Sequence, residues 1–104
     1  MRVTPQTVPI EFEQTMGCTV ADLLRWLPVA LPGAEVDAAT TLQRARATFV
    51  DGTLELNWRP LPSRRLALLE VPCLQVRFTY AGMTAQRRHE VQRRLDLATQ
   101  RGGG

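Results

Sequence analysis

The sequence RARATFVDGTLELNWR, residues 44–59, predicts a β-hairpin, and the expected fold class follows from it. Asp51-Gly52 near its centre is typical of a two-residue type I′ turn, because both central positions of that turn need φ above zero and glycine adopts such angles freely. On either side of this turn apolar and polar residues alternate, as in strands with one buried face. The apolar pairs expected to face each other are Phe49–Leu54, Ala47–Leu56 and Ala45–Trp58.

The first third of the chain predicts one strand and one helix. Residues 8–14 alternate, with Ile10 on the apolar side, and predict a short strand. Thr19 is expected to cap a helix, and Asp22 completes a capping box three positions later. Pro28 is expected to kink or end this helix, because proline lacks a backbone N–H and clashes with the preceding turn.

The second half of the chain predicts further strands and a second helix. Pro60-Leu61-Pro62 is expected to end the second hairpin strand, and Val71-Pro72 is expected to form a turn. The remaining elements are expected at residues 35–37 (a strand or a loop), 64–70 and 73–80 (strands) and 84–99 (a helix capped by Thr84).

Together these elements predict an α+β fold. We expect a single antiparallel β-sheet of about 4–6 strands with two helices packed on one face, in the order β-α-β(4)-α. In element order this resembles the TATA-binding-protein-like or helix-grip arrangement. The length of 104 residues fits one domain, residues 1–104, with residues 101–104 as a flexible glycine tail.

The charge of the chain is unevenly distributed. Thirteen arginines and no lysine oppose ten acidic residues, for a formal net charge of +3. Residues 1–40 carry two arginines and five acids, whereas residues 41–104 carry eleven arginines and five acids. A basic half of this kind suits an anionic partner. No apolar run or leader-like segment predicts a membrane span or a signal peptide, so we expect a cytoplasmic protein that does not bind membranes.

Four arginines are the candidate partner-binding residues. In the predicted register, the solvent-facing side of the sheet carries Arg44, Arg46, Arg59 and Arg77. Guanidinium groups bind carboxylates and phosphates, so the leading hypothesis is a non-catalytic binding or adaptor domain that contacts an anionic or protein partner through this face. Nucleic acid is less favoured, because the aromatic residues that would stack on bases fall on the buried face. The alternative is a solvated face on which these arginines pair with Glu11, Glu13 and Glu55.

Patterns that indicate catalysis or metal binding are few. Cys18 precedes the predicted helix N-terminus, where the helix dipole favours a thiolate, so it is the candidate reactive thiol. The alternative for Cys18 is a small buried hydrophobe, and a bridge to Cys73 depends on the fold. His89 is the only histidine, and no cysteine lies at ligand spacing from it, so neither a metal site nor a cofactor is expected. A binding domain is therefore favoured over an enzyme.

Two further functions stay open. A sheet that cups a helix can hold a small apolar ligand, and Trp26, Trp58 and Tyr80 are candidates to line such a space, unless they fill it. The C-terminal residues Gly102-Gly103-Gly104 resemble the diglycine tail of ubiquitin-like sulfur carriers, and this resemblance implies activation of the chain end. Exposure of both Trp26 and Leu97 would indicate an apolar patch with a role in dimer formation.

Overall fold

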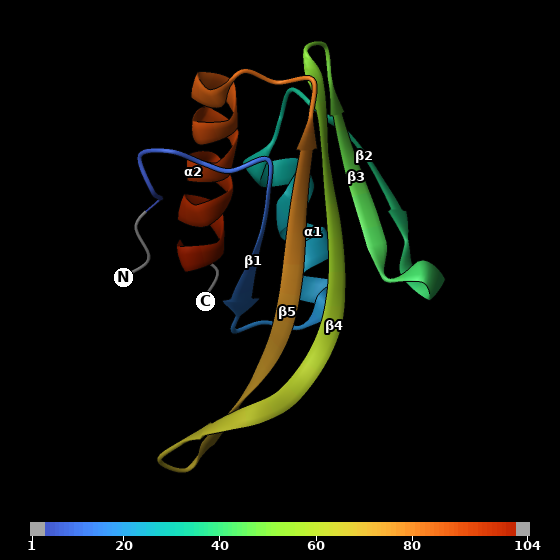
Figure 1. The fold of residues 1–104 in the computed structure, drawn as a ribbon. Coiled ribbons are helices and arrows are strands. Elements are labelled where there is room, and N and C mark those ends of the chain that lie inside the picture. Colours follow the sequence, from blue (N-terminus) through green and yellow to red (C-terminus); the bar gives the residue numbers. More distant parts are fainter. Residues whose placement is uncertain (1–3, 102–104) are drawn as a thin grey trace.

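Within residues 4–101, which the computed structural model describes with side chains for residues 4–99, the fold is a five-stranded antiparallel sheet with two helices (Figure 1). The strands lie in the order β1-β5-β4-β3-β2, so the first and last strands pair at one side of the sheet. The elements in chain order are β1 (Glu11–Met16), α1 (Val20–Ala30), β2 (Glu35–Ala39), a short 3₁₀ turn η1 (Thr40–Leu42), β3 (Arg44–Phe49), β4 (Gly52–Leu66), β5 (Leu69–Ala81) and α2 (Ala85–Arg101).

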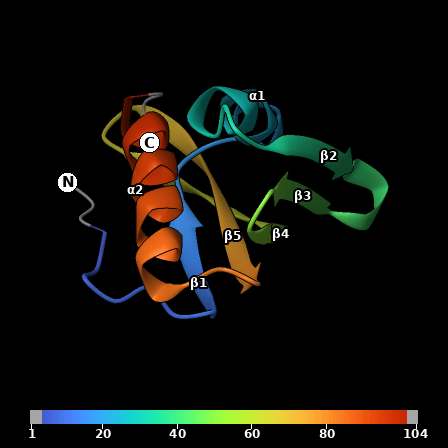
Figure 2. The same ribbon diagram turned by 90° about the horizontal axis from the view of Figure 1, so that it is seen from above.

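The α+β class and the element order β-α-β(4)-α predicted from the sequence are confirmed within these residues. Both helices lie on one face of the curved sheet (Figure 2), and the apolar faces of sheet and helices form one core. The ambiguous residues near position 36 form the edge strand β2, which pairs with β3. Arg101, predicted as the first residue of the glycine tail, belongs to α2, and residues 102–104 of that predicted tail lie outside the described residues.

The central hairpin forms, but its turn lies one residue earlier than predicted. Residues 50–51 are the loop, and Gly52 is the first residue of β4. Phe49 therefore faces Gly52 instead of Leu54, a shift of two residues that leaves every side chain on its predicted face because the side-chain period is two. Gly52 is needed for close approach: a Cβ atom here would lie 2.3 Å from the backbone oxygen of Ala81.

β1 begins at Glu11, three residues later than predicted. Pro9 has no N–H with which to extend the ladder, and Ile10, expected on the apolar side, is exposed. The carbonyl of Ile10 still accepts a hydrogen bond from the N–H of Tyr80 at 2.7 Å. Further along β1, Phe12 stacks on Phe78 of β5 with 5.1 Å between ring centroids, which fixes this strand on the sheet.

α1 begins as predicted and extends past its proline. Oγ1 of Thr19 accepts a hydrogen bond from the N–H of Asp22 at 3.1 Å, and Oδ2 of Asp22 accepts one from the N–H of Thr19 at 3.3 Å. These bonds, together with a hydrogen bond from Arg25, hold the pKa of the Asp22 carboxyl below its usual value. Pro28 does not end the helix, which continues to Ala30 because its apolar side is buried in the core.

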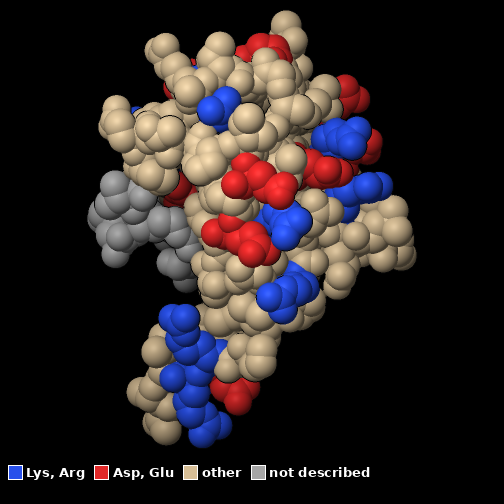
Figure 3. Space-filling view, viewed as in Figure 1, with Lys and Arg blue, Asp and Glu red and all other residues tan. Residues whose placement is uncertain are grey.

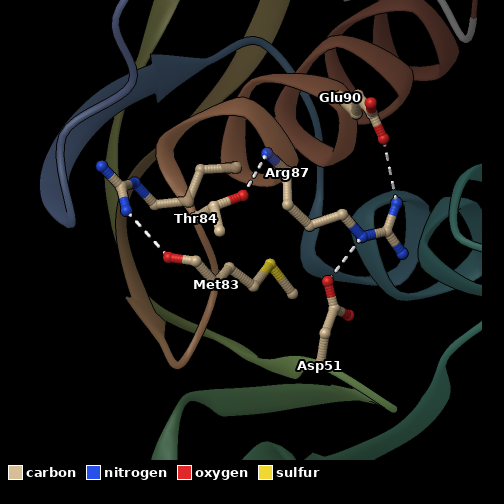
Figure 4. Close-up of polar contacts among 6 residues, drawn as sticks. Asp51, Met83, Thr84, Arg87 and Glu90 are labelled. Carbon is tan, nitrogen blue, oxygen red and sulfur yellow. Dashed lines mark hydrogen bonds and ion pairs between the residues drawn. The ribbon is translucent and has the colours of Figure 1, made fainter.

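The N-terminus of α2 is tied to the β3–β4 hairpin (Figure 4). Oγ1 of Thr84 accepts a hydrogen bond from the N–H of Arg87 at 3.1 Å, which confirms Thr84 as the cap. The Arg87 side chain donates to Asp51 at 3.0 Å, contacts Glu90 at 3.4 Å and lies over the ring of Phe49, 5.2 Å from its centroid. Arg87 therefore joins the loop of one hairpin to the first turn of the last helix.

A buried polar network fixes α2 on the sheet. The hydroxyl of Tyr80 donates to Oε1 of Gln92 at 2.7 Å, and Nε2 of Gln92 donates to Asp96 at 3.0 Å. Thr4 donates to the other Asp96 oxygen at 2.7 Å, which joins the N-terminal segment to the network. Burial raises the pKa of the Tyr80 hydroxyl above its usual value, and the Asp96 carboxylate adds to the effect, whereas Arg88 opposes it. Tyr80 therefore stays protonated as a hydrogen-bond donor.

Candidate partner-binding surface

The four predicted site arginines lie on strands β3, β4 and β5, at positions that alternate with buried residues. The sheet register places Arg44 and Arg77 on either side of Asn57, and it places Arg46 opposite Glu55. Arg59 is opposite Gln75 on β5. The solvent-facing side of the sheet thus brings these arginines together.

Glutamates on the same face compensate three of these four arginines. Oε1 of Glu55 lies 3.5 Å from nitrogen atoms of both Arg44 and Arg46. Arg77 lies 3.7 Å from Glu11 and 3.8 Å from Glu13. Exposed pairs of this kind contribute about 0–1 kcal/mol each, and they cancel much of the local positive potential. Figure 3 shows the basic and acidic side chains alternating across this face.

Arg59 makes no ion pair within residues 4–99. It borders a shallow depression of about 260 Å³ together with Gln75 and Glu13. Arg59 lies just beyond Asn57, the last residue of β4 that pairs with β3, between the compensated part of the face and the outer part of the β4–β5 hairpin.

The β4–β5 hairpin projects beyond the rest of the sheet as a two-stranded arm (Figure 1). β3 pairs with β4 only as far as Asn57, and β1 pairs with β5 only as far as Leu74, so the ribbon beyond them has no neighbouring strand. Residues 62–70, which we call the hairpin arm, are all exposed. The predicted strand over residues 64–70 is therefore wrong: the chain reverses direction at Ala67-Leu68.

Two of the prolines in this ribbon, Pro60 and Pro72, are compatible with it because of where their missing N–H groups would point. In an antiparallel strand the N–H groups of alternate residues point to opposite sides. The N–H of Trp58 points to the β3 side and donates a hydrogen bond at 3.0 Å to the carbonyl of Gln43, the residue before β3. The nitrogen of Pro60 therefore points to the same side, beyond the end of β3. On β5 the N–H of Tyr80 points to β1, so by the same alternation the nitrogen of Pro72 points to that side, beyond the end of β1. Neither Pro60-Leu61-Pro62 nor Val71-Pro72 ends a strand, contrary to the prediction.

A β-bulge after Leu61 lets β4 carry one extra residue, and it accommodates Pro62. Beyond the bulge, Arg65 faces Glu70, and Leu66 faces Leu69. Because side chains alternate between the faces of a ribbon, Leu66 and Leu69 share one face, with Arg64 and Val71 beside them. Arg65 and Glu70 lie on the opposite face, 3.6 Å apart.

The tip of the arm is apolar. Leu66, Leu68 and Leu69 are 53%, 100% and 69% exposed. Arg64 borders the leucine face and makes no ion pair within residues 4–99, whereas Arg65 is paired. Contiguous exposed apolar side chains with a polar border mark interaction sites in soluble proteins. We define Arg64, Leu66, Leu68 and Leu69 as the arm site.

The hairpin that carries the arm site, though not its exposure, has a signal in the sequence. Around residues 67–68, Leu66 and Leu69 are symmetric, and so are the opposite charges of Arg65 and Glu70. This symmetry is the signature of a hairpin. When Pro62 and Pro72 on either side are interpreted as strand breaks, this symmetry is overlooked.

Ala67 adopts a left-handed backbone conformation with φ of 55°, which is unfavourable for a residue with a Cβ atom. We expect Ala67→Gly to stabilise the arm by about 0.5–1 kcal/mol, because glycine adopts this conformation without strain. Amide hydrogen exchange in the arm should slow by a few fold. Leu68→Gly is the matched control and should give faster exchange; equal slowing in both variants would contradict this explanation.

The candidate reactive thiol lies in the core. Cys18 is 2% exposed, and neither Cys18 nor Cys73 forms a disulfide. A thiol at this depth is not accessible to a large substrate. Among residues 4–99 no group of three or more metal-ligating side chains comes together. Trp58 and Tyr80, candidates to line a ligand space under the helices, are buried within the apolar core.

Comparison with known proteins assigns no family, because no family model, no curated protein and no solved structure matches this chain. Neither helix within residues 4–101 combines the length and apolar character needed to cross a membrane. The arm site is therefore the feature that indicates a function most directly.

Proposed function

We propose that this chain is a non-catalytic binding or adaptor domain that inserts its hairpin arm into an apolar pocket of a protein partner. The exposure of three leucines at the tip of a projecting ribbon carries the proposal. Burying one leucine side chain releases about 1.5–3 kcal/mol. A partner that covers the arm site therefore gains enough free energy to offset part of the cost of association.

Charge supports a protein partner with an acidic group at the rim of its pocket. Arg64 borders the leucine face without an ion pair in residues 4–99 and is available to a carboxylate. A nucleic-acid partner is less favoured, because glutamates compensate three arginines of the sheet face and no broad basic surface results. Arg44, Arg46 and Arg77 would have to leave their glutamates to bind an anionic partner, whereas Arg59 would not. Unbridged Cys18 and Cys73 are compatible with action in the reducing cytoplasm.

Two adjacent arginines of the arm should differ in their effect on binding. We expect Arg64→Ala to weaken partner binding by about tenfold, since hydrogen bonds between charged groups contribute about 1.5–3 kcal/mol. Arg65→Ala should change the affinity by less than about threefold, because Arg65 faces away from the leucines and pairs with Glu70. Titration of each variant against the partner measures both effects. Equal losses would contradict the assignment of Arg64 to the docking face.

Site-specific photo-crosslinking in the native host cells tests the proposal. A photoreactive residue in place of Leu68 should give one protein adduct, identified by mass spectrometry. The same residue in place of Val50, the fully exposed apolar residue at the tip of the other hairpin, should not give that adduct. An adduct common to both positions, a nucleic-acid adduct, or an adduct with a second copy of this chain would overturn the proposal.

A further inference from the structure

A second apolar surface lies between the two helices, on the face of the molecule opposite the exposed side of the sheet. A groove of about 760 Å³ is lined by Trp26 and Val29 of α1, by Pro32, and by Leu97 of α2. Val29 and Leu97 are exposed, although each is next to a buried residue of its helix. The volume falls within the range of about 300–1,000 Å³ that is typical of small-molecule sites.

Two arginines also line the groove, and none of the acidic side chains within residues 4–99 does. Arg25 pairs with Asp22 at 2.7 Å. Glu90, four residues before Arg94, pairs with Arg87 instead, and Arg94 makes no ion pair within residues 4–99. An apolar groove with an unopposed guanidinium is complementary to a molecule that has an apolar chain and one anionic head group.

We propose that this groove binds a long-chain carboxylate. The apolar chain would lie along Trp26, Val29 and Leu97, and the carboxylate would accept hydrogen bonds from Arg94. Arginine suits this role because its planar fork can bond both carboxylate oxygens.

Other occupants fit less well. A second copy of the chain in a two-fold symmetric contact would bring the unpaired Arg94 of each copy into one interface, which like-charge repulsion disfavours. The groove is also separate from the hairpin arm, so this proposal does not depend on the proposed function.

Tryptophan fluorescence of the full chain, titrated with dodecanoate below its micelle concentration, tests the inference. Trp58 is 5% exposed and lies on the inner side of the sheet, so a saturable change would report Trp26. We expect one dodecanoate per chain by calorimetry. Acetate, which lacks the chain, and dodecanol, which lacks the charge, should each bind at least tenfold more weakly.

Variants on α2 distinguish a specific site from a general detergent effect. Arg94→Ala should weaken dodecanoate binding by about tenfold, and Arg94→Gln should do the same. Arg93→Ala, a change at the neighbouring exposed arginine that does not line the groove, should have no effect. Leu97→Asp should abolish binding, and all variants should keep the parent melting temperature within about 2 °C.

Several results would overturn the carboxylate site. These are equal binding of dodecanol and dodecanoate, equal losses in Arg93→Ala and Arg94→Ala, no saturable signal, or a dimer in sedimentation whose formation requires Trp26. Variants of Arg64 and Leu66 in the arm should bind dodecanoate like the parent, which separates a failure here from a failure of the proposed function.

Discussion

Replacing both paired leucines of the arm, in Leu66→Ser with Leu69→Ser, should lower the affinity for the partner by about 100-fold or more. The two side chains face each other on one side of the ribbon and are exposed in the free protein. Each should contribute about 1.5–3 kcal/mol when a partner buries it, and 1.4 kcal/mol corresponds to a tenfold change in affinity. The melting temperature should stay within about 2 °C of the parent, because no core contact is lost. Titration against the partner identified by cross-linking at position 68 measures the loss.

The control for this double variant is Leu42→Ser. Leu42 is also an exposed leucine, but it lies in η1, which connects the edge strand β2 to β3. Its replacement should leave partner binding unchanged. A double variant that binds like the parent would contradict the arm site, and a large fall in its melting temperature would show that the leucines serve stability instead.

Gly52→Ala should destabilise the protein by about 3 kcal/mol, near the upper end of the range for overpacking. A Cβ atom here would lie 2.3 Å from the backbone oxygen of Ala81 and 2.8 Å from Cγ of Met83. The methionine side chain can move, but the carbonyl belongs to the last residue of β5, which pairs with Thr53. The melting temperature should fall by more than about 10 °C, which calorimetry or thermal circular dichroism measures.

Gly33→Ala is the matched control, because no atom lies within 4 Å of the Cβ that it would add. We expect its stability to equal that of the parent or to rise by up to about 1 kcal/mol, since alanine restricts the unfolded chain. Similar losses in both variants would contradict the contact with Ala81 as the reason that Gly52 is necessary.

The hairpin at residues 44–59 shows what sequence patterns can predict. Alternation assigned each side chain to the correct face, and this was enough for the fold class. It could not fix the register, because a shift of two residues preserves both faces. The observed register places Gly52 against the backbone of Ala81, where a Cβ atom would not fit. These two residues are far apart in the sequence, so no local pattern indicates this contact.

The arm was missed because the meaning of a proline depends on tertiary structure. Pro60 and Pro72 would break a strand that had neighbours on both sides. They are tolerated here because β3 and β1 end before reaching them. Whether a neighbouring strand is present at that point cannot be read from the prolines themselves.

The candidate site was predicted in part. The shared face of Arg44, Arg46, Arg59 and Arg77 follows from alternation along the strands, and the structure places them on that face. The ion pairs of Arg77 with Glu11 and Glu13, which the sequence offers only as an alternative, depend on β1 joining β5, which is a non-local contact. The exposure of the arm leucines depends on the same topology, because it occurs only where both neighbouring strands have ended.

Hydrogen–deuterium exchange of the chain with and without its cross-linked partner tests most directly whether the arm is the docking site. We predict slower exchange in residues 64–71 when the partner is bound and little change in β3 around Arg44 and Arg46. Protection of β3 and of β5 around Arg77, with an unchanged arm, would contradict this prediction and return the binding site to the exposed face of the sheet.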